Sequence, residues 1–331
     1  MNLLRVEKDI TLQREEIKHN RKKNISGWLY ALPYVLSFTI FIIVPLVWGF
    51  ITSFMKYNPY DTSGNGFYTN LFYNYYVIIF KSGSNYYSQI FWKALGTTML
   101  FDIVAVPCLI FVPLVLAYLV NLHPPGYKLF RAIIYLPSVL SVATMGAIFV
   151  LMFAQSDQGF INALLGTEIK WLEGINRWIV ILIASVWWQS GQNFVIFSAA
   201  LRDVDKSLFE ASSIDGCGKF KQFIYITLPA IKNQMVICMF TTVIGYMSLY
   251  AQPNVIYSAI NRNEIVSPIM LIQRTISNPD TYNLIGLMTA TSFVFAFFLM
   301  ILSAIQMYAT REKKGGNKYA KKYQTYLRER S

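Results

Sequence analysis

Residues Ser207–Pro229 read SLFEASSIDGCGKFKQFIYITLP, a stretch that separates two long apolar segments. Ser207 and Glu210 have the spacing of a capping box, which predicts that a short helix begins there. Gly216 and Gly218 follow, and glycine readily adopts the left-handed conformation that ends a helix. A second short amphipathic segment then leads into the next apolar run. The stretch therefore predicts two short helices joined by a glycine turn.

The residues on either side of this stretch are strongly apolar. Of the 331 residues, 55% are hydrophobic and only 14% are charged, whereas a typical soluble domain carries roughly 25% charged residues. A protein folded in water could not hide so much apolar surface behind so few charges. The composition excludes a soluble globular protein and a disordered chain, and it predicts a membrane protein.

Six apolar segments have the length that crossing a bilayer requires, which is about 20 residues per helix. They are Trp28–Phe54, Lys93–Val120, Phe130–Phe153, Trp178–Leu201, Ile231–Tyr250 and Asn283–Ala309. Prolines in the first three predict kinks rather than breaks, because neighbouring helices can satisfy the carbonyls that proline leaves unpaired. We therefore expect an all-α polytopic membrane protein with six transmembrane helices.

The positive charges are unevenly distributed between the connecting segments. The net charge is +12, and 22 of the 29 Lys and Arg residues fall in residues 1–27, 121–131, 202–232 and 310–331. Cytoplasmic loops carry such an excess, so we expect both termini and the 202–230 loop to be cytoplasmic. The chain then divides into an N-terminal segment 1–27, a transmembrane domain 28–309 and a basic tail 310–331. Because the charges form no single basic face, they do not indicate nucleic-acid binding.

Motifs for metal, nucleotide or covalent chemistry are missing from the sequence. The three cysteines and two histidines are scattered, with no C-x-x-C or H-E-x-x-H motif, so we expect neither a disulfide framework nor a metal site. No G-x-x-x-x-G-K-[ST] loop is present to hold ATP. We therefore predict no catalytic residues and no cofactor on this chain.

The loop sequence has a second, more specific pattern. Glu210-Ala211-Ser212 is followed after three residues by Gly216, and after nine more by Ile226-Thr227-Leu228-Pro229. This pattern resembles the EAA loop of ABC importer permeases, whose form is E-A-A, three residues, G, nine residues, I-x-L-P. Ser212 is the one departure, because alanine is usual there. The resemblance to the carbohydrate branch, of maltose and glycerol-3-phosphate type, is carried by Phe130-Arg131, Leu136-Pro137, Gly159-Phe160-Ile161-Asn162, Trp171-Leu172, Leu201 and Ile214-Asp215-Gly216.

The resemblance implies a fold, a function and partners. It implies the type I transmembrane-domain fold in the cytoplasmic membrane, forming half of the pathway for a sugar or oligosaccharide delivered by an extracellular binding protein. The implied partners are a second, homologous permease and an ABC ATPase dimer that holds ATP and Mg. An apolar helix face docks well in a groove, and the residues assigned to ATPase coupling are Leu208, Phe209, Glu210, Ala211, Ile214, Asp215 and Gly216.

One departure from the family pattern concerns the outer loop 251–282. Many such permeases carry a Gly-Gly-Pro turn after the fifth span, whereas residues 261–264 read NRNE here. We therefore expect this loop to fold differently, and the solute and the outer docking surface depend on it.

Polar side chains inside the apolar segments are the candidates for a substrate path, because polarity inside a membrane is costly and usually functional. Asp102 is the only acidic residue within a predicted span. It either accepts sugar hydroxyls in a cavity, or it pairs with Lys93 or a backbone donor.

The other candidates lie on the fourth and fifth predicted spans. Gln189 and Asn193 are four residues apart on one helix face, beside Trp188. Sugar binding and interhelical hydrogen bonding explain these amides equally well. Tyr246 and Tyr250 either line the same path or anchor the end of their helix at the membrane interface.

Other functions remain open at this point. A permease of this family for a polyol or a glycerophosphodiester would fit the same residues. A secondary transporter would usually show charged residues or inverted repeats within its spans, and only Asp102 points that way. A membrane-embedded transferase would need a catalytic constellation, for which Asp203 and Asp205 are the one closely spaced acidic pair beside a span.

Overall fold

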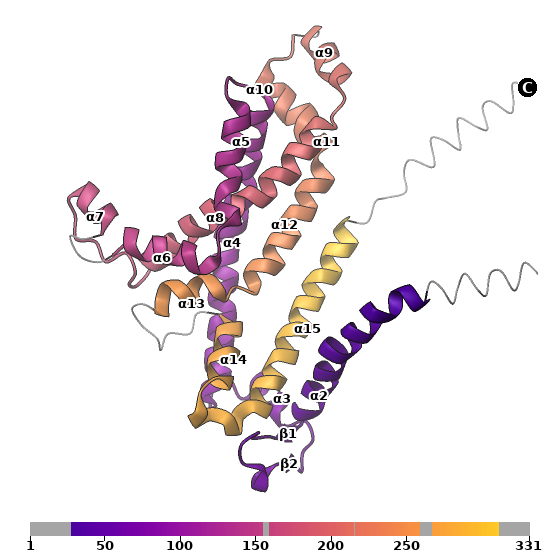
Figure 1. The fold of residues 1–331 in the computed structure, drawn as a ribbon, viewed down its shortest axis with the longest axis vertical. Coiled ribbons are helices and arrows are strands. Elements are labelled where there is room, and N and C mark those ends of the chain that lie inside the picture. Colours follow the sequence, from indigo (N-terminus) through magenta and orange to yellow (C-terminus); the bar gives the residue numbers. More distant parts are fainter. Residues whose placement is uncertain (1–27, 155–158, 215, 259–266, 311–331) are drawn as a thin grey trace, which may run out of the picture.

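The computed structural model describes residues 28–154, 159–214, 216–258 and 267–310, and this part of the chain is mostly helical (Figure 1). Its helices that are long and apolar enough to cross a membrane are Trp28–Thr52, α4 (Tyr86–Asn121), α8 (Asn176–Arg202) and Pro279–Tyr308. Two bent helix pairs also qualify if each pair is one span. The described residues therefore supply four to six spans, which confirms the predicted helical membrane fold at that level.

The shorter elements connect these long helices. The first span contains η1 (Thr39–Ile43) and α2 (Val44–Thr52), and before α4 come β1 (Met55–Lys56), η2 (Thr62–Gly64), β2 (Gly66–Phe67) and α3 (Tyr73–Phe80). Between α4 and α8 lie α5 (Tyr127–Tyr135), η3 (Leu136–Val139), α6 (Val142–Met152) and α7 (Phe160–Leu165). After α8 come α9 (Lys206–Ile214), α10 (Lys219–Gln222), η4 (Phe223–Thr227), α11 (Leu228–Ala230), α12 (Lys232–Met247), α13 (Ala251–Ser258), α14 (Pro268–Ile276), η5 (Pro279–Leu284) and α15 (Ile285–Thr310). The two short strands pair antiparallel, with Met55 opposite Phe67.

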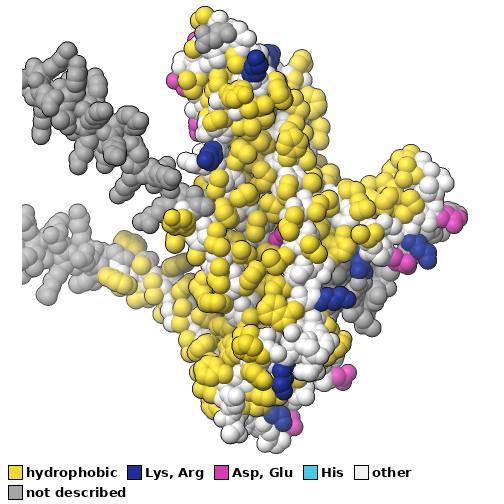
Figure 2. All heavy atoms as spheres, turned by 180° about the vertical axis from the view of Figure 1, so that it is seen from behind, with side chains coloured by type: hydrophobic (Ala, Val, Ile, Leu, Met, Phe, Trp, Pro, Cys, Tyr) yellow, Lys and Arg dark blue, Asp and Glu magenta, His cyan; other side chains and the backbone are white. Residues whose placement is uncertain are grey.

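Helix α4 is the centre of the bundle. It packs along α8 and contributes to three separate apolar clusters, represented by Leu109, Leu95 and Leu114. The flank of the bundle is covered by hydrophobic side chains, while charged side chains gather towards its ends and on the projecting arm that contains α6 and α7 (Figure 2). That distribution suits a protein whose flank contacts lipid or other apolar helices.

The kink predicted for the span Phe130–Phe153 is a sharp bend in the structure. The helical segments Tyr127–Val139 and Val142–Met152 are bent by 99° relative to one another. Ser141 has an extended backbone, and its Oγ accepts the Thr144 N–H at 3.1 Å, which caps a new helix. Composition and length predict a continuous apolar helix here, but a local cap after the Pro137 turn starts a second helix in another direction.

Prolines alter the helices in two further ways. A proline has no N–H, so the carbonyl four residues before it loses its helical partner. Pro45 and Pro229 each follow a π-helical segment, η1 and η4 respectively. The helix Lys219–Ala230 then meets α12 at an angle of 70°. The fifth predicted span, Ile231–Tyr250, therefore begins at this bend.

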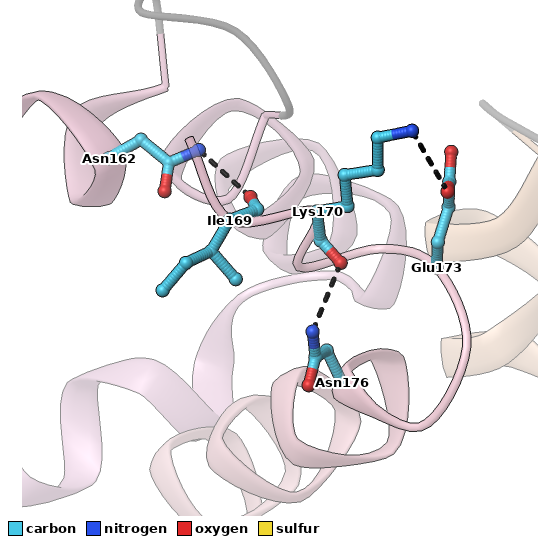
Figure 3. Close-up of polar contacts among 5 residues, drawn as sticks. All are labelled: Asn162, Ile169, Lys170, Glu173 and Asn176. Atoms are coloured by element: carbon cyan, nitrogen blue, oxygen red, sulfur yellow. Dashed lines mark hydrogen bonds and ion pairs between the residues drawn. The ribbon is translucent and has the colours of Figure 1, made fainter. Parts of the chain in front are cut away.

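The loop after α7 is organised by the buried amide of Asn162. Asn162 Nδ2 donates to the Ile169 carbonyl at 2.9 Å, and Trp171 Nε1 donates to Asn162 Oδ1 at 2.8 Å. Figure 3 shows the Asn162 bond and the neighbouring Lys170–Glu173 ion pair, whose charged atoms are 3.8 Å apart. These bonds give the G-F-I-N and W-L segments a structural role in shaping the arm.

Candidate coupling loop and substrate path

Helices α9 and α10 form a hairpin at the end of the bundle where α4 and α8 also end (Figure 1). Helix α9 begins at Lys206, so its N-cap position is Asp205, two residues before the predicted N-cap Ser207. Asp205 Oδ1 accepts the Ser207 N–H at 2.9 Å, and this bond lowers the pKa of the Asp205 carboxyl. Asp205 is therefore the N-cap, and the predicted capping box of Ser207 and Glu210 is wrong. In a capping box the Ser207 N–H would donate to the Glu210 side chain, but here it donates to Asp205 instead.

The glycine turn lies where the sequence predicts it. Gly216 has φ +75°, in the left-handed region. Its N–H donates to the Ser213 carbonyl at 3.1 Å, and the Cys217 N–H donates to the Ser212 carbonyl at 2.9 Å. This pair of bonds is the Schellman arrangement that ends helices. Asp215, which belongs to the predicted coupling set, lies outside the described residues.

Gln222 ties the two helices of the hairpin together, and the sequence patterns did not identify it. Its Nε2 lies 2.9 Å from Ser212 Oγ, 2.9 Å from Ser213 Oγ and 3.2 Å from the Phe209 carbonyl. Ser212 stands where the family pattern has alanine, so its hydroxyl adds a bond that alanine could not make. A glutamine ten residues after a serine carries no periodic signal, so the sequence alone does not point to this contact.

The hairpin leaves one apolar face of α9 uncovered. At about 100° per residue, Phe209, Ser212 and Ser213 share the face towards Gln222, and Phe209 is half-buried there. Glu210 and Ala211 are exposed, and the side chains of Leu208 and Ile214 are 50% and 88% exposed. Of the four apolar residues predicted for docking, three therefore face outward, whereas Phe209 packs inward.

In the predicted substrate path, the amide of Asn193 bridges three helices. Asn193 is buried, and its Nδ2 donates to the Leu109 carbonyl of α4 at 3.0 Å and lies 3.4 Å from Thr242 Oγ1 of α12. Leu109 is four residues before Pro113, so its carbonyl has no helical donor. Asn193 supplies that donor, which is the interhelical role left open by the sequence.

The neighbouring polar residues of α8 are used differently. Trp188 Nε1 donates to the Leu140 carbonyl at 2.9 Å, directly at the bend before α6. Gln189 Nε2 donates to Gln192 Oε1 at 2.8 Å near the surface. Gln189 and Asn193 therefore do not act on a common partner in this structure, although they are one turn apart.

Asp102 and Tyr246 lie together in the interior of the bundle. Asp102 is 6% exposed, and neither carboxylate oxygen has a hydrogen-bond partner among the described residues. Tyr246 is also buried, with its hydroxyl near Asp102 and near the Ser185–Gln252 pair, whose hydrogen bond is 2.8 Å long. No ion pair of Asp102 with Lys93 is present in the described part of the chain. Tyr250 is partly buried and packs against the apolar cluster represented by Leu109.

The Asn193 contact gives a testable stability effect. Replacing Asn193 with alanine is expected to lower the unfolding free energy by about 1–2 kcal/mol, because the Leu109 carbonyl loses its donor. In a Pro113→Ala background the helix regains its own N–H, so the same Asn193 substitution should cost clearly less. Unfolding in mild detergent measures both values, and equal losses in the two backgrounds would show that this carbonyl is not what Asn193 satisfies.

Comparison with known proteins identifies relatives along nearly the whole chain. The lactose transport system permease of Rhizobium radiobacter is 26% identical over 322 residues, covering 92% of this chain and 99% of the relative. The arabinooligosaccharide transport system permease of Halalkalibacterium halodurans is 30% identical over 306 residues, covering 89% and 90%. Both relatives are named as transport permeases rather than enzymes.

Solved structures and a family model agree with these relatives. A bacterial ABC transporter involved in the import of alginate has a chain with TM-score 0.71 and 18% identity, covering 90% of this chain and 99% of that one. The alginate transporter in complex with its periplasmic protein, loaded with alginate pentasaccharide, gives TM-score 0.68 and 17% identity, covering 88% and 96%. The model for binding-protein-dependent transport system inner membrane components matches residues 110–314, which include the hairpin, α8 and α12. This chain therefore belongs to the family of binding-protein-dependent transport system inner membrane components.

Proposed function

We propose that the chain is the permease subunit of an ATP-driven importer for a sugar or oligosaccharide. The observation that carries the proposal is the uncovered apolar face of α9, at the end of the bundle, within a loop of EAA pattern. A separate ABC ATPase dimer would dock there, since large exposed apolar side chains on a rigid helix are suited to a groove. Relatives named for lactose and arabinooligosaccharides support a sugar rather than a polyol or a glycerophosphodiester.

The same proposal includes the arrangement in the membrane. The excess of Lys and Arg in 1–27, 202–230 and 310–331 supports a cytoplasmic location of both termini and of the hairpin. Counting each bent helix pair as one span gives six spans in the domain 28–309. A second, homologous permease would complete the pathway, and an extracellular binding protein would deliver the solute.

Asp102 is proposed as the residue of the path with the largest effect on uptake. A buried carboxyl group that has no hydrogen-bond partner among the described residues is available to bond sugar hydroxyls. Asp102→Asn is expected to lower the uptake rate by up to about tenfold, roughly the value of one hydrogen bond to a substrate hydroxyl, with assembly unchanged. Asp203→Asn, at an exposed carboxylate beside α8, is the matched control. Wild-type uptake kinetics in Asp102→Asn would assign this carboxylate a structural role.

Affinity purification of the tagged chain from its native membrane tests the function itself. Co-purification of an ABC ATPase and a second permease, followed by ATP-dependent uptake of labelled sugars in proteoliposomes, is the expected result. A chain that purifies alone and moves solute without ATP would contradict the proposal and favour a secondary transporter.

A further inference from the structure

A cavity of about 590 Å³ lies where the hairpin joins the bundle. The end of α4, the end of α8, the start of α9 and the helix that begins with α10 all contribute to its lining. Its charged lining residues are the cations Arg202, Lys206 and Lys219, together with the titratable His123, and no Asp or Glu lines it. A volume of this size lies within the range of small-molecule sites, about 300–1,000 Å³.

The three cations come from three different helix ends. Arg202 is the last residue of α8, Lys206 is the first of α9, and Lys219 is the first of α10. A helix N-terminus already carries partial positive charge, so a lysine there is electrostatically unfavourable. Two of the three cations are therefore placed where a helix alone would disfavour them, and an anion in the cavity would reverse that cost.

Nearby carboxylates do not neutralise these cations. Among the described residues, neither Arg202 nor the two lysines form a salt bridge. The Arg202 Nε donates to the Ser198 carbonyl at 2.9 Å, which holds the guanidinium at the end of α8. Asp205 lies next to Lys206 in sequence, but it does not line the cavity and its Oδ1 accepts the N–H of Ser207.

The remaining lining of the cavity is divided between polar and apolar groups. Asn121 and Thr227 add neutral polar side chains, while Leu122, Leu201 and Val204 form an apolar part of the wall. A cationic rim beside an apolar wall is suited to an amphiphile with a phosphate group. Basic pockets between helix ends at a membrane surface are where anionic lipid headgroups bind.

We propose that this cavity binds a phosphate-bearing anion, held by Arg202, Lys206 and Lys219. The bound phosphate joins the end of α8 to both helices of the hairpin. It therefore stabilises the orientation of α9 relative to the bundle. An anionic lipid headgroup and free inorganic phosphate share this chemistry, and the experiment below distinguishes them. The proposal does not depend on which solute the protein transports.

The test uses the full-length chain, purified with whichever subunits remain bound to it. It is placed in nanodiscs of phosphatidylcholine alone, of phosphatidylcholine with an equal amount of phosphatidylglycerol, or of phosphatidylcholine with inorganic phosphate in the buffer. Bound phospholipid is measured by native mass spectrometry, and phosphate binding by the shift in thermal unfolding midpoint. The variants are Arg202→Gln, Lys219→Gln and their combination, and the control is Lys221→Gln, an exposed lysine of the same short helix that does not line the cavity.

Each cavity substitution is expected to weaken binding about fivefold, with a larger loss in the double variant, while Lys221→Gln binds as the wild type does. Binding of phosphatidylglycerol alone identifies a lipid headgroup, and a midpoint shift with inorganic phosphate identifies a free phosphate; either result supports the site. The proposal is overturned if the double variant binds both probes as the wild type does, or if Lys221→Gln loses as much. It is also overturned if the double variant loses a bound ATPase but keeps both probes, because the cations would then serve a protein partner.

Discussion

Replacing Ile214 with aspartate is expected to abolish ATP-driven uptake while the chain still inserts and folds. The Ile214 side chain is 88% exposed on α9, so a charge there disturbs little packing within the chain. If α9 docks in a groove of the ATPase, the same charge would be buried against apolar surface. Interface hot spots contribute about 2 kcal/mol or more, which corresponds to roughly 30-fold weaker docking.

Three further variants make this result specific. Ile214→Leu keeps an apolar side chain and should retain uptake, whereas Ala211→Asp on the same exposed face should fail as Ile214→Asp does. Gly216→Pro should fail for a different reason. Proline cannot reach a φ of +75° and has no N–H for the Ser213 carbonyl. Uptake and ATPase co-purification are measured on membrane-inserted protein, and normal uptake by inserted Ile214→Asp would exclude α9 as the docking surface.

Gly286→Val is expected to give the largest loss of stability, about 3 kcal/mol. A Cβ atom at Gly286 would overlap the Met55 carbonyl oxygen, and it would lie 3.1 Å from the Thr52 carbonyl oxygen. Both neighbours are backbone atoms at the end of the first span, so they cannot rotate away as a side chain could. Helix α15 would have to separate from the turn that follows α2.

Gly96→Ala in α4 is the matched control. A Cβ at Gly96 meets no atom within 4 Å, and alanine is the better helix former by about 1 kcal/mol. The control should therefore be neutral or slightly more stable. Thermal unfolding in mild detergent compares the two variants, and equal midpoints would show that α15 can move away from the Met55 carbonyl without cost.

Features that depend on neighbouring residues could be predicted only where one local pattern dominates. The turn at Gly216 follows from the conformational freedom of glycine and from bonds within six residues. The N-cap differs from the predicted Ser207 because two local patterns compete, and only the backbone geometry shows that Asp205 is used. Ser141 and Thr144 were a detectable cap signal, but the strong apolar pattern of the segment concealed it.

The sequence by itself determined the membrane class, the α9–α10 hairpin and its glycine turn, since hydrophobic length and helix ends depend on residues close together in the chain. Only the tertiary structure decided which donor satisfies the Leu109 carbonyl and where the apolar residues of α9 face. It also brought Arg202 and Lys219 to one cavity. Such contacts join residues from different helices, and the packing of those helices selects among many pairings that are equally compatible with the local pattern.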